Sequence, residues 1–466
     1  MHSQHTAQAP FRASSAQADR RASRPAAGAC IEALQVARAR TLALFDSLAA
    51  EALLGPRLAI VNPPLWEFGH LGWFQERWLL RPRADGSLAP SRMPGADALY
   101  DSSAVPHATR WDLPLPTPDA TRAYLAQVLA QASDTLAHAG PVLSDSAVGR
   151  GLAFHATVCA QHEQMHAEAF TYSRQTLGYP ALAADAALRA PAVFDVAEAA
   201  EGDVRIDGGT FLLGAGTGDG FAYDNEKQAH AVTVASFAIA RSATTCAAFA
   251  AFVDDGGYDA ARWWSDAGWR WRQAAGAAGP AYWRPMLARQ GWEVRDHDAW
   301  HPLHAEAPML HVNAHEAEAW CRWAGRRLPT EAEWEFAASG GGHGAKRRHP
   351  WGEAVPDPRY ANLWFPGLPS AVGRADALPA GDSLHGCRQM IGNAWEWTAS
   401  PFEAYPGFQP DPYREYSAPW FGTHRVLRGG CFATAASLIR NTWRNFFTPD
   451  RRDVHAGFRT CALGER

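Results

Sequence analysis

Residues 151–178 read GLAFHATVCAQHEQMHAEAFTYSRQTLG and indicate one long helix. Apolar residues recur at intervals of three and four, and a Gly at the end of the stretch predicts where the helix stops. Residues four apart share a face of a helix, so His162 and His166 can offer two imidazoles to one metal ion. His155 lies eleven residues before His166, about 16 Å along a helix, and is too distant to bind the same ion. We expect His155 to be packed in the protein or exposed on its surface.

The rest of the N-terminal half has the same helical pattern. Similar apolar spacing occurs in CIEALQVARARTLALFDSLAAEAL (30–53), LWEFGHLGWFQERWLL (65–80) and PDATRAYLAQVLAQASDTLAHA (118–139). Four such segments predict a four-helix bundle over residues 29–186. The first 28 residues predict a disordered tail, or alternatively an Arg-rich transit peptide.

The pattern changes after an Ala- and Pro-rich stretch, which predicts a linker at residues 187–203. Short strand-like pieces, many Gly and Pro, and many Trp follow over residues 204–466. A loop-rich α+β domain with an aromatic core is expected there, which makes the whole chain an α+β protein of two domains.

Bulk properties narrow the classes of partner. A formal net charge of −5 argues against nucleic acid and anionic membrane surfaces, and no apolar run of about 18 residues occurs that could span a membrane. Seven scattered cysteines without a close pair fit a reducing compartment, so a cytoplasmic location is expected. The partners expected are small molecules.

HEQMH also satisfies the H-E-x-x-H pattern of zinc peptidases, in which Glu163 would act as the general base. The third histidine of the longer peptidase pattern is missing, and a helical bundle offers no evident cleft for a peptide. Glu163 is alternatively a residue of the helix surface. A third ligand is best sought on another helix, where His70 stands among aromatic and aliphatic residues. Three neutral imidazoles suit Fe(II) that binds O2 and a substrate together, although Zn(II) or Cu(II) would accept the same ligands.

These motifs resemble a known family. LWEFGHLGWFQERWLL and HEQMH resemble the DinB-like domain of the nonheme-iron sulfoxide synthases of ergothioneine biosynthesis. GGTFLLGA (208–215), RRLPTEAEWEFAA (326–338), GNAWEWT (392–398), RVLRGG (425–430) and GFR (457–459) resemble their formylglycine-generating-enzyme domain, which is C-type-lectin-like. MHAEAFTYSRQTLGYP (165–180) is most similar to the selenoneine synthase branch.

The resemblance implies Fe(II) bound by His70, His162 and His166, with O2 as co-substrate. It implies that hercynine, the trimethylated betaine of histidine, is attacked at imidazole C2 by sulfur or selenium. It also implies that tyrosines of the C-terminal domain reach the metal, and DPYREYSAPWF (411–421) supplies Tyr413 and Tyr416 for that role. A phenol can donate a proton or a hydrogen atom. The alternative is that both tyrosines only pack a loop.

Two departures from the thiol-using members concern the donor. Met165 stands where those members tend to have Gln, and the chain reads Asn445, Phe446, Phe447 where members using γ-glutamylcysteine have Asn-Trp-Asp. Without a carboxylate at position 447, a donor's ammonium group lacks its natural partner. A selenosugar donor is therefore expected, and a thiol donor is the alternative.

Two arginines are candidates for holding the donor. Arg451 could bind an anionic or hydroxylated part of it, and Arg110 in HATRWDLPLP (107–116) is a second candidate. Both could equally be structural.

Two other functions remain open. A copper-dependent formylglycine generator needs a cysteine pair, but Thr434 and Leu438 stand near where those cysteines would fall. A non-catalytic lectin-like binding protein would explain the Trp-rich loops but not the three histidines. RRLPTEAEWEFAA and GNAWEWT are expected to be framework, because their Trp and Glu can lock loops together.

Overall fold

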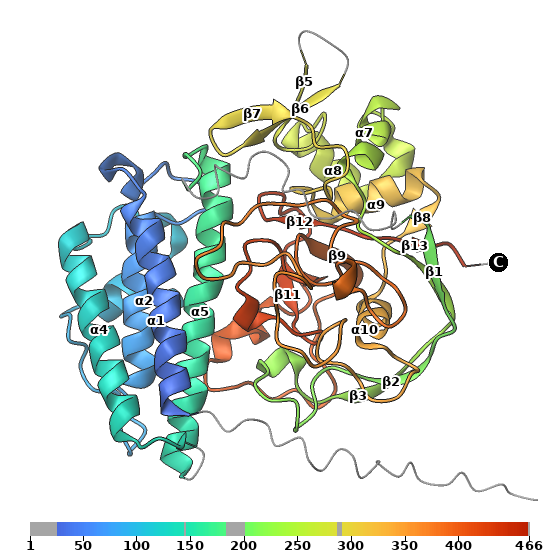
Figure 1. Cartoon of the computed structure of the whole chain (residues 1–466). Coiled ribbons are helices and arrows are strands. Elements are labelled where there is room, and N and C mark those ends of the chain that lie inside the picture. The colour runs from blue at the N-terminus through green and yellow to red at the C-terminus, as the bar shows by residue number, and fades with distance from the viewer. Residues whose placement is uncertain (1–25, 144–145, 183–200, 287–290, 465–466) are drawn as a thin grey trace, which may run out of the picture.

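The computed structural model describes residues 26–143, 146–182, 201–286 and 291–464. A group of long helices forms one side of the molecule, and a loop-rich part with short strands forms the other (Figure 1). Residues 1–25 of the predicted tail and 187–200 of the predicted linker lie outside the described residues. The predicted tail is wrong at its last two positions, because the first helix already begins at Ala27.

Four long helices pack side by side in the N-terminal part. They are α1 (Ala27–Asp46), α2 (Pro64–Leu79), α4 (Pro118–His138) and α5 (Ala147–Leu177). Shorter helical turns join them: η2 (Ala50–Leu53), α3 (Ala96–Tyr100) and η3 (His107–Thr109). The first predicted segment is therefore broken, since its last residues form the separate turn η2.

Helix α5 has clear start and stop signals. The hydroxyl of Ser146 accepts a hydrogen bond from the Gly149 N–H, and Gly178 ends the helix in the left-handed conformation at φ 66°. The predicted end at Gly178 is confirmed. The start lies at Ala147, four residues before the predicted segment, because the Ser cap adds a turn at that end.

The C-terminal part is built from short elements. Its strands are β1 (Asp203–Ile206), β2 (Gly209–Leu213), β3 (His230–Val234), β4 (Phe237–Ala240), β5 (Trp283–Pro285), β6 (Trp292–Asp296), β7 (Ala299–Pro302), β8 (Arg326–Arg327), β9 (Trp395–Pro401), β10 (Arg425–Arg428), β11 (Asn445–Phe447), β12 (Ala456–Gly457) and β13 (Cys461–Ala462). Its α-helices are α7 (Cys246–Asp254), α8 (Asp266–Ala275), α9 (Ala314–Trp323) and α10 (Glu331–Ser339). Its 3-10 turns are η5 (Asp224–Glu226), η6 (Ala261–Trp263), η7 (Pro379–Gly381), η8 (Arg414–Tyr416), η9 (Ala418–Trp420) and η10 (Ala436–Leu438).

The strands form small sheets from distant parts of the chain. One sheet has the order β1-β4-β13-β8 and another the order β11-β10-β9-β12, while β2-β3 and β5-β6-β7 are local. Among the described residues, the paired strands are antiparallel except β12 with β9. Buried Trp334, Trp395 and Trp397 fill the space between these elements. The expected aromatic core is thus present.

The two framework motifs expected from the sequence, RRLPTEAEWEFAA and GNAWEWT, do hold loops together. The Nε1–H of Trp334 donates to Glu396 at 2.7 Å, and Arg459 donates to the same carboxylate through Nε at 2.6 Å. Glu331 accepts from Arg444 Nε at 2.7 Å. These buried ion pairs hold the loops of the C-terminal part in place, as long helices hold the N-terminal part.

Helix α5 lies between the other long helices and the C-terminal part (Figure 1). The buried carboxylate of Glu168 accepts hydrogen bonds from Trp395 Nε1 at 2.7 Å and from Thr434 Oγ1 at 2.6 Å. Further along the helix, the Gln175 amide donates to the Arg295 carbonyl at 2.7 Å. One helix therefore anchors both parts. No helix among the described residues is long and apolar enough to cross a membrane.

Candidate metal centre

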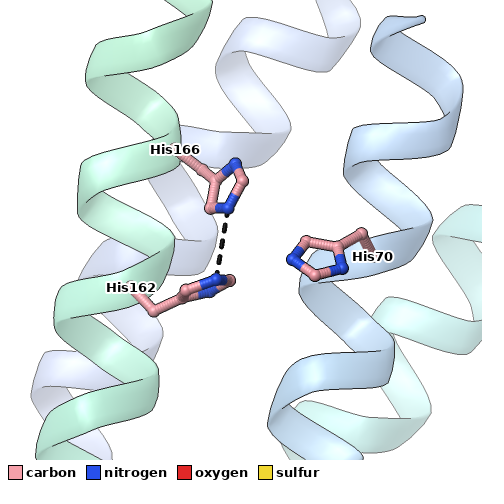
Figure 2. A group of neighbouring side chains, drawn as sticks. All are labelled: His70, His162 and His166. Atoms are coloured by element: carbon pink, nitrogen blue, oxygen red, sulfur yellow. Dashed lines mark hydrogen bonds between the residues drawn. The ribbon is translucent and has the colours of Figure 1, made fainter. Parts of the chain in front are cut away.

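Three imidazoles converge between α2 and α5. His162 and His166 project from neighbouring turns of α5, and His70 faces them from α2 (Figure 2). One ligand atom from each histidine lies within 4.8 Å of the other two. The ring centroids of His70 lie 5.2 Å from each of the other rings. The predicted trio is thus brought together, as helical spacing requires.

Hydrogen bonds orient two of the rings. His70 donates from Nδ1 to the Tyr100 carbonyl at 2.8 Å, and His166 donates from Nδ1 to the Glu67 carboxylate at 2.5 Å. In each ring the Nε2 lone pair is then left to face the centre of the trio. Such partners fix the tautomer of metal-binding histidines and raise their basicity.

The surroundings keep the imidazoles of His70 and His162 neutral. Burial, followed by the nearby His166, lowers the pKa of His70 to about 3. The pKa of His162 is also well below its ordinary value, again through burial first and its histidine neighbours second. Neutral imidazole is the form that binds metal ions.

A metal ion fits these residues. The Nε2 atoms of His162 and His166 lie 3.2 Å apart, so two lone-pair nitrogens point at each other unless one of them is protonated. A cation held by both, and by His70, would satisfy all three rings at once. Three neutral nitrogen ligands would also leave coordination positions for small molecules.

Aromatic rings close one side of the trio. Phe74 stacks on His162 with the ring centroids 3.7 Å apart, and the ring of Tyr413 lies 6.3 Å from that of His162. Tyr416 lies 6.1 Å from Tyr413 and directs its hydroxyl to the sulfur of Met165 at 3.9 Å. Burial raises the pKa of both phenols, so both hydroxyls keep their hydrogen. The structure thus places both predicted tyrosines and Met165 at this end of the trio.

The predicted donor-binding residues are arranged around Tyr416 and α5. Phe446 lies 6.0 Å from Tyr416, and its own ring stacks on Phe402 at 4.1 Å. Phe447 lies beneath the guanidinium of Arg451 at 5.1 Å. The side-chain oxygen of Asn445 accepts from the Phe446 N–H at 2.8 Å. Phe446 and Phe447 are consecutive residues of β11, so their side chains point to opposite faces of the strand, Phe446 toward Tyr416 and Phe447 toward Arg451.

Arg451 is already paired. Its Nε and Nη2 donate to the two oxygens of Asp453 at 2.6 and 2.7 Å. Asp453 accordingly raises the pKa of Arg451 against the opposing effect of burial. Sequence reasoning missed this pair, although Asp453 stands only two positions after the arginine.

Arg110 and His155 lie outside the trio. Arg110 donates to Asn62 at 2.7 Å and to the Val105 carbonyl at 3.2 Å, and its guanidinium covers the face of Trp66 at 3.8 Å. Its charge still acts on the trio, because after burial and the nearby His166 it also lowers the pKa of His70. His155 stacks on Trp78 with centroids 5.4 Å apart.

The two alternative motifs have structural roles. Glu163 is buried and forms a salt bridge with Arg38 at 2.7 Å, so it is neither a free general base nor a residue of the helix surface. Thr434 stands at one of the positions where formylglycine generators would have cysteine. Its hydroxyl donates a hydrogen bond to Glu168. Leu438 is fully buried in the core.

Some residues at the site were not predicted. Glu67 precedes His70 by three positions, so the helical period alone could have placed both on one face. The stacking of Phe74 on His162 also follows from that period, since Phe74 lies four residues after His70. The Tyr100 carbonyl and Glu168 had no local signal, because their partners are remote in the sequence.

Comparison with known proteins identifies both parts. Residues 33–170 match the DinB superfamily, and residues 190–462 match the sulfatase-modifying factor enzyme 1-like domain. The chain is 39% identical over 439 residues to a hercynine oxygenase of Mycolicibacterium smegmatis, covering 91% of this chain and 96% of that protein. It is 40% identical over 434 residues to a hercynine oxygenase of Mycobacterium tuberculosis, again covering 91% and 96%.

The C-terminal part has a second group of relatives. A formylglycine-generating enzyme of Streptomyces coelicolor is 37% identical over 285 residues, which cover 56% of this chain and 88% of that enzyme. The hercynine oxygenases match along both parts, whereas this enzyme matches the C-terminal part. The chain therefore belongs to the hercynine oxygenase family, with a DinB-superfamily domain followed by a sulfatase-modifying factor enzyme 1-like domain.

Proposed function

We propose that this protein is an O2-dependent nonheme Fe(II) enzyme that forms a carbon–selenium bond at imidazole C2 of hercynine, with a selenosugar as donor. The observation that carries the proposal is the convergence of three imidazoles beside two protonated phenols. Family membership supplies hercynine, because the relatives that match along the whole chain are hercynine oxygenases.

His70, His162 and His166 would hold the iron, which when bound supplies the place where O2 is reduced. Glu67 and the Tyr100 carbonyl fix the rings of His166 and His70. Phe74 covers His162 and keeps water from that side. These residues prepare the site without any charged group of their own pointing at its centre.

The two tyrosines are proposed to move the proton or hydrogen atom. Tyr416 is the first candidate and Tyr413 the second. Tyr413 lies near His162, while the hydroxyl of Tyr416 is directed at the weak sulfur acceptor of Met165 at 3.9 Å and lies next to the N–H donor of Trp443. A weakly held phenol hydrogen is free to turn toward a substrate.

The surroundings of Phe447 and Arg451 favour a neutral sugar as the donor. Phe447 offers an aromatic face where a carboxylate would grip an ammonium group, and Asp453 already neutralises Arg451. An amino-acid donor would leave its amine unpaired, which costs a few kcal/mol and thus about a hundredfold in affinity. The outer N–H groups of Arg451 would bind a hydroxyl rather than a carboxylate.

The second candidate is formation of a carbon–sulfur bond with a thiol donor. About 40% identity to hercynine oxygenases along 91% of the chain fits this candidate equally well, since nothing in that likeness distinguishes selenium from sulfur. The two candidates share the metal centre and hercynine and differ only in the donor.

A donor competition tests the proposal. Protein loaded anaerobically with Fe(II) is given hercynine, O2 and either a selenosugar, a thiosugar or γ-glutamylcysteine, and products are followed by mass spectrometry. The selenosugar should give the highest kcat/KM. Equal use of γ-glutamylcysteine would replace the selenium assignment with the sulfur one, and absence of any hercynine product would overturn both.

A substitution of Phe447 tests the choice of donor more directly. Phe447→Asp should weaken use of the selenosugar and admit γ-glutamylcysteine, because it restores a partner for the amine. Phe447→Leu is the matched control, since it removes the ring without adding charge. It should weaken sugar use but leave γ-glutamylcysteine excluded.

A further inference from the structure

The two phenols beside the metal centre stand on a loop with little regular structure. Tyr413 and Tyr416 belong to residues 411–421, where the regular structure is limited to the three-residue turns η8 and η9. Such short turns leave the direction of a side chain to its tertiary contacts. The direction of the Tyr416 phenol therefore depends on the groups packed around it.

One neighbour covers the flat face of Tyr416. The ring of Tyr223 stacks on it, with the centroids 4.1 Å apart and an interplanar angle of 21°. Phe446 meets Tyr416 edge-on at 6.0 Å, and Tyr413 lies tilted at 6.1 Å. Among the described residues, Tyr223 is thus the aromatic side chain that lies flat against this phenol. A flat contact of this kind restricts the tilt of the ring and hence the direction of its hydroxyl.

The turn η5 holds the same loop through polar side chains. The Ser417 hydroxyl donates to the Asp224 carboxylate and accepts from Asn225 Nδ2 at 3.0 Å. Lys227, directly after the turn, donates to Asp411. Ser417 is fully buried, so its hydrogen bonds are not readily exchanged for water. The loop is therefore held on both sides of the segment that carries the two phenols.

Residues 223–227, called the clamp segment below, are themselves fixed to the core of the C-terminal domain. Glu226 is fully buried, accepts from the Tyr223 N–H at 2.9 Å and forms an ion pair with Arg440. The Thr442 hydroxyl donates to the same carboxylate at 2.7 Å. A buried carboxylate with all these partners resists displacement, because any movement would leave a charge unpaired. The clamp segment is thus a firm support for the loop.

Tyr223 is not suited to exchange a hydrogen atom with Tyr416. Its hydroxyl is buried, and no hydrogen-bond partner faces it in the described part of the chain, so its proton has no acceptor. The guanidinium of Arg440 lies 5.6 Å from the centre of its ring, and a positive charge there opposes removal of an electron. The ring face of Tyr223, rather than its hydroxyl, is therefore the part that acts on Tyr416.

We propose that Tyr223 is a positioning residue, whose ring keeps the Tyr416 phenol directed at Met165 and the histidine trio while the rest of the clamp segment holds the loop. This inference rests on the proposed function, because it concerns the phenol that is assigned there to proton or hydrogen-atom transfer. Displacing a reacting group by about 1 Å can cost about a hundredfold in rate. Tyr223 would thus act on turnover without touching a substrate.

Two variants of Tyr223 separate its ring from its hydroxyl. Tyr223→Leu removes the stacking face, so kcat should fall about tenfold or more while the KM for hercynine stays within about twofold. Tyr223→Phe restores the face and should recover most of the lost kcat. Protein loaded with Fe(II) is assayed with hercynine, O2 and a selenosugar, and in a parallel arm with γ-glutamylcysteine. Each variant is compared with the natural chain on the same donor, and its iron content should equal that of the natural chain.

Fluorine NMR follows the phenol without the reaction. The tyrosines are replaced by fluorotyrosine, and the resonance of Tyr416 is assigned by its loss in Tyr416→Phe. A stacked ring shifts the resonances of the nuclei that it covers. The Tyr416 resonance should therefore move and broaden in Tyr223→Leu and keep its position in Tyr223→Phe. This readout needs neither hercynine nor a donor, so failure of the inference can be told from failure of the proposed function.

A substitution in the loop tests the clamp segment while leaving the stacked ring in place. Ser417→Ala removes the hydrogen bonds to Asp224 and Asn225, so kcat should fall about threefold or more and the Tyr416 resonance should broaden. Ser383→Ala is the matched control, because it removes a buried hydroxyl that accepts from the Cys387 N–H elsewhere in the same domain. It should leave kcat and the resonance unchanged. If Tyr223→Leu does not fold, these two serine variants decide the matter.

Several results would overturn the proposal. An unchanged kcat or an unmoved resonance in Tyr223→Leu would mean that the stack does not position the phenol. Equal losses of kcat in Tyr223→Leu and Tyr223→Phe would assign the effect to the hydroxyl, and loss of iron in Tyr223→Leu would assign it to the metal centre. A natural chain that forms no hercynine product would overturn the proposed function instead, and the fluorine resonance would still decide whether Tyr223 orients Tyr416.

Discussion

The two domains reach rigidity by opposite means. In the helical domain, regular helices set the positions of His70, His162 and His166, and burial lowers the pKa of His70 and His162. In the C-terminal domain, buried ion pairs such as Arg459 with Glu396 and Arg440 with Glu226 hold short strands and loops in place. The helical domain thus relies on regular helices, whereas the C-terminal domain, which has little regular structure, uses buried ion pairs to hold its loops.

Removing one imidazole from the helical domain is expected to have the largest effect. His70→Ala should abolish metal binding and hercynine turnover together, because a three-ligand site has no ligand to spare. Metal content by mass spectrometry and product formation measure both. His155→Ala should retain its metal in full, and full iron occupancy in His70→Ala would disprove the ligand assignment.

The next largest effect tests whether the C-terminal domain contributes chemistry as well as support. Tyr416→Phe keeps the ring but removes the hydrogen, so turnover should fall about 10² to 10⁴-fold while hercynine affinity holds. Tyr413→Phe is the second variant, and Tyr360→Phe, on the Trp351 stack, is the control. Unchanged rates and products in both of the first two would contradict a role for the phenols.

The buried ion pairs of the C-terminal domain can be tested separately. Glu396→Gln leaves the guanidinium of Arg459 buried without its counter-charge and should lower the free energy of unfolding by about 3–5 kcal/mol. Glu293→Gln, which loses an exposed pair with Arg284, should cost less than about 1 kcal/mol. Chemical denaturation measures the free energy of unfolding of both variants. Equal losses would mean that burial does not determine how much an ion pair contributes to stability.

A milder change tests how much the hydrogen bond between His166 and Glu67 contributes to metal affinity. Glu67→Gln removes the charge that His166 faces and should weaken metal affinity about 10 to 100-fold without preventing binding. A competition titration with a chelator gives the affinity. Glu32→Gln, on the exposed face of α1, serves as the control, and an unaltered affinity in Glu67→Gln would remove Glu67 from the site.

The smallest effect concerns pH and the C-terminal domain. Burial lowers the pKa of His349 from 6.5 to about 4, so the folded protein resists protonation that the unfolded chain accepts. Stability should therefore be complete above pH 6.5 and fall as the pH drops toward 4, by about 1–2 kcal/mol between pH 7 and 5 for this residue. His349→Gln should flatten the decline in urea unfolding, and a decline of the same size in this variant would refute the assignment.

Sequence reasoning succeeded where spacing is local and failed where contacts are remote. The pair four residues apart on one helix was sufficient to find His162 and His166, and a lone histidine on a second helix gave His70. By contrast, β13 joins β4 and β8 across more than a hundred positions, and two-residue strands carry no periodic signal. The pairing of Glu163 with Arg38 was missed for the same reason.

The anchor on α5 also has a consequence for synthesis on the ribosome. Glu168 precedes its partner Trp395 by 227 residues, so at about 5–20 residues per second the partner emerges some ten seconds or more later. Through that interval the carboxylate is in water and ionised, and burial raises its pKa only when the second domain arrives. The histidine trio is thus made long before Tyr413 and Tyr416, and a metal ion captured by the nascent chain would stay open to solvent until the phenols close over it.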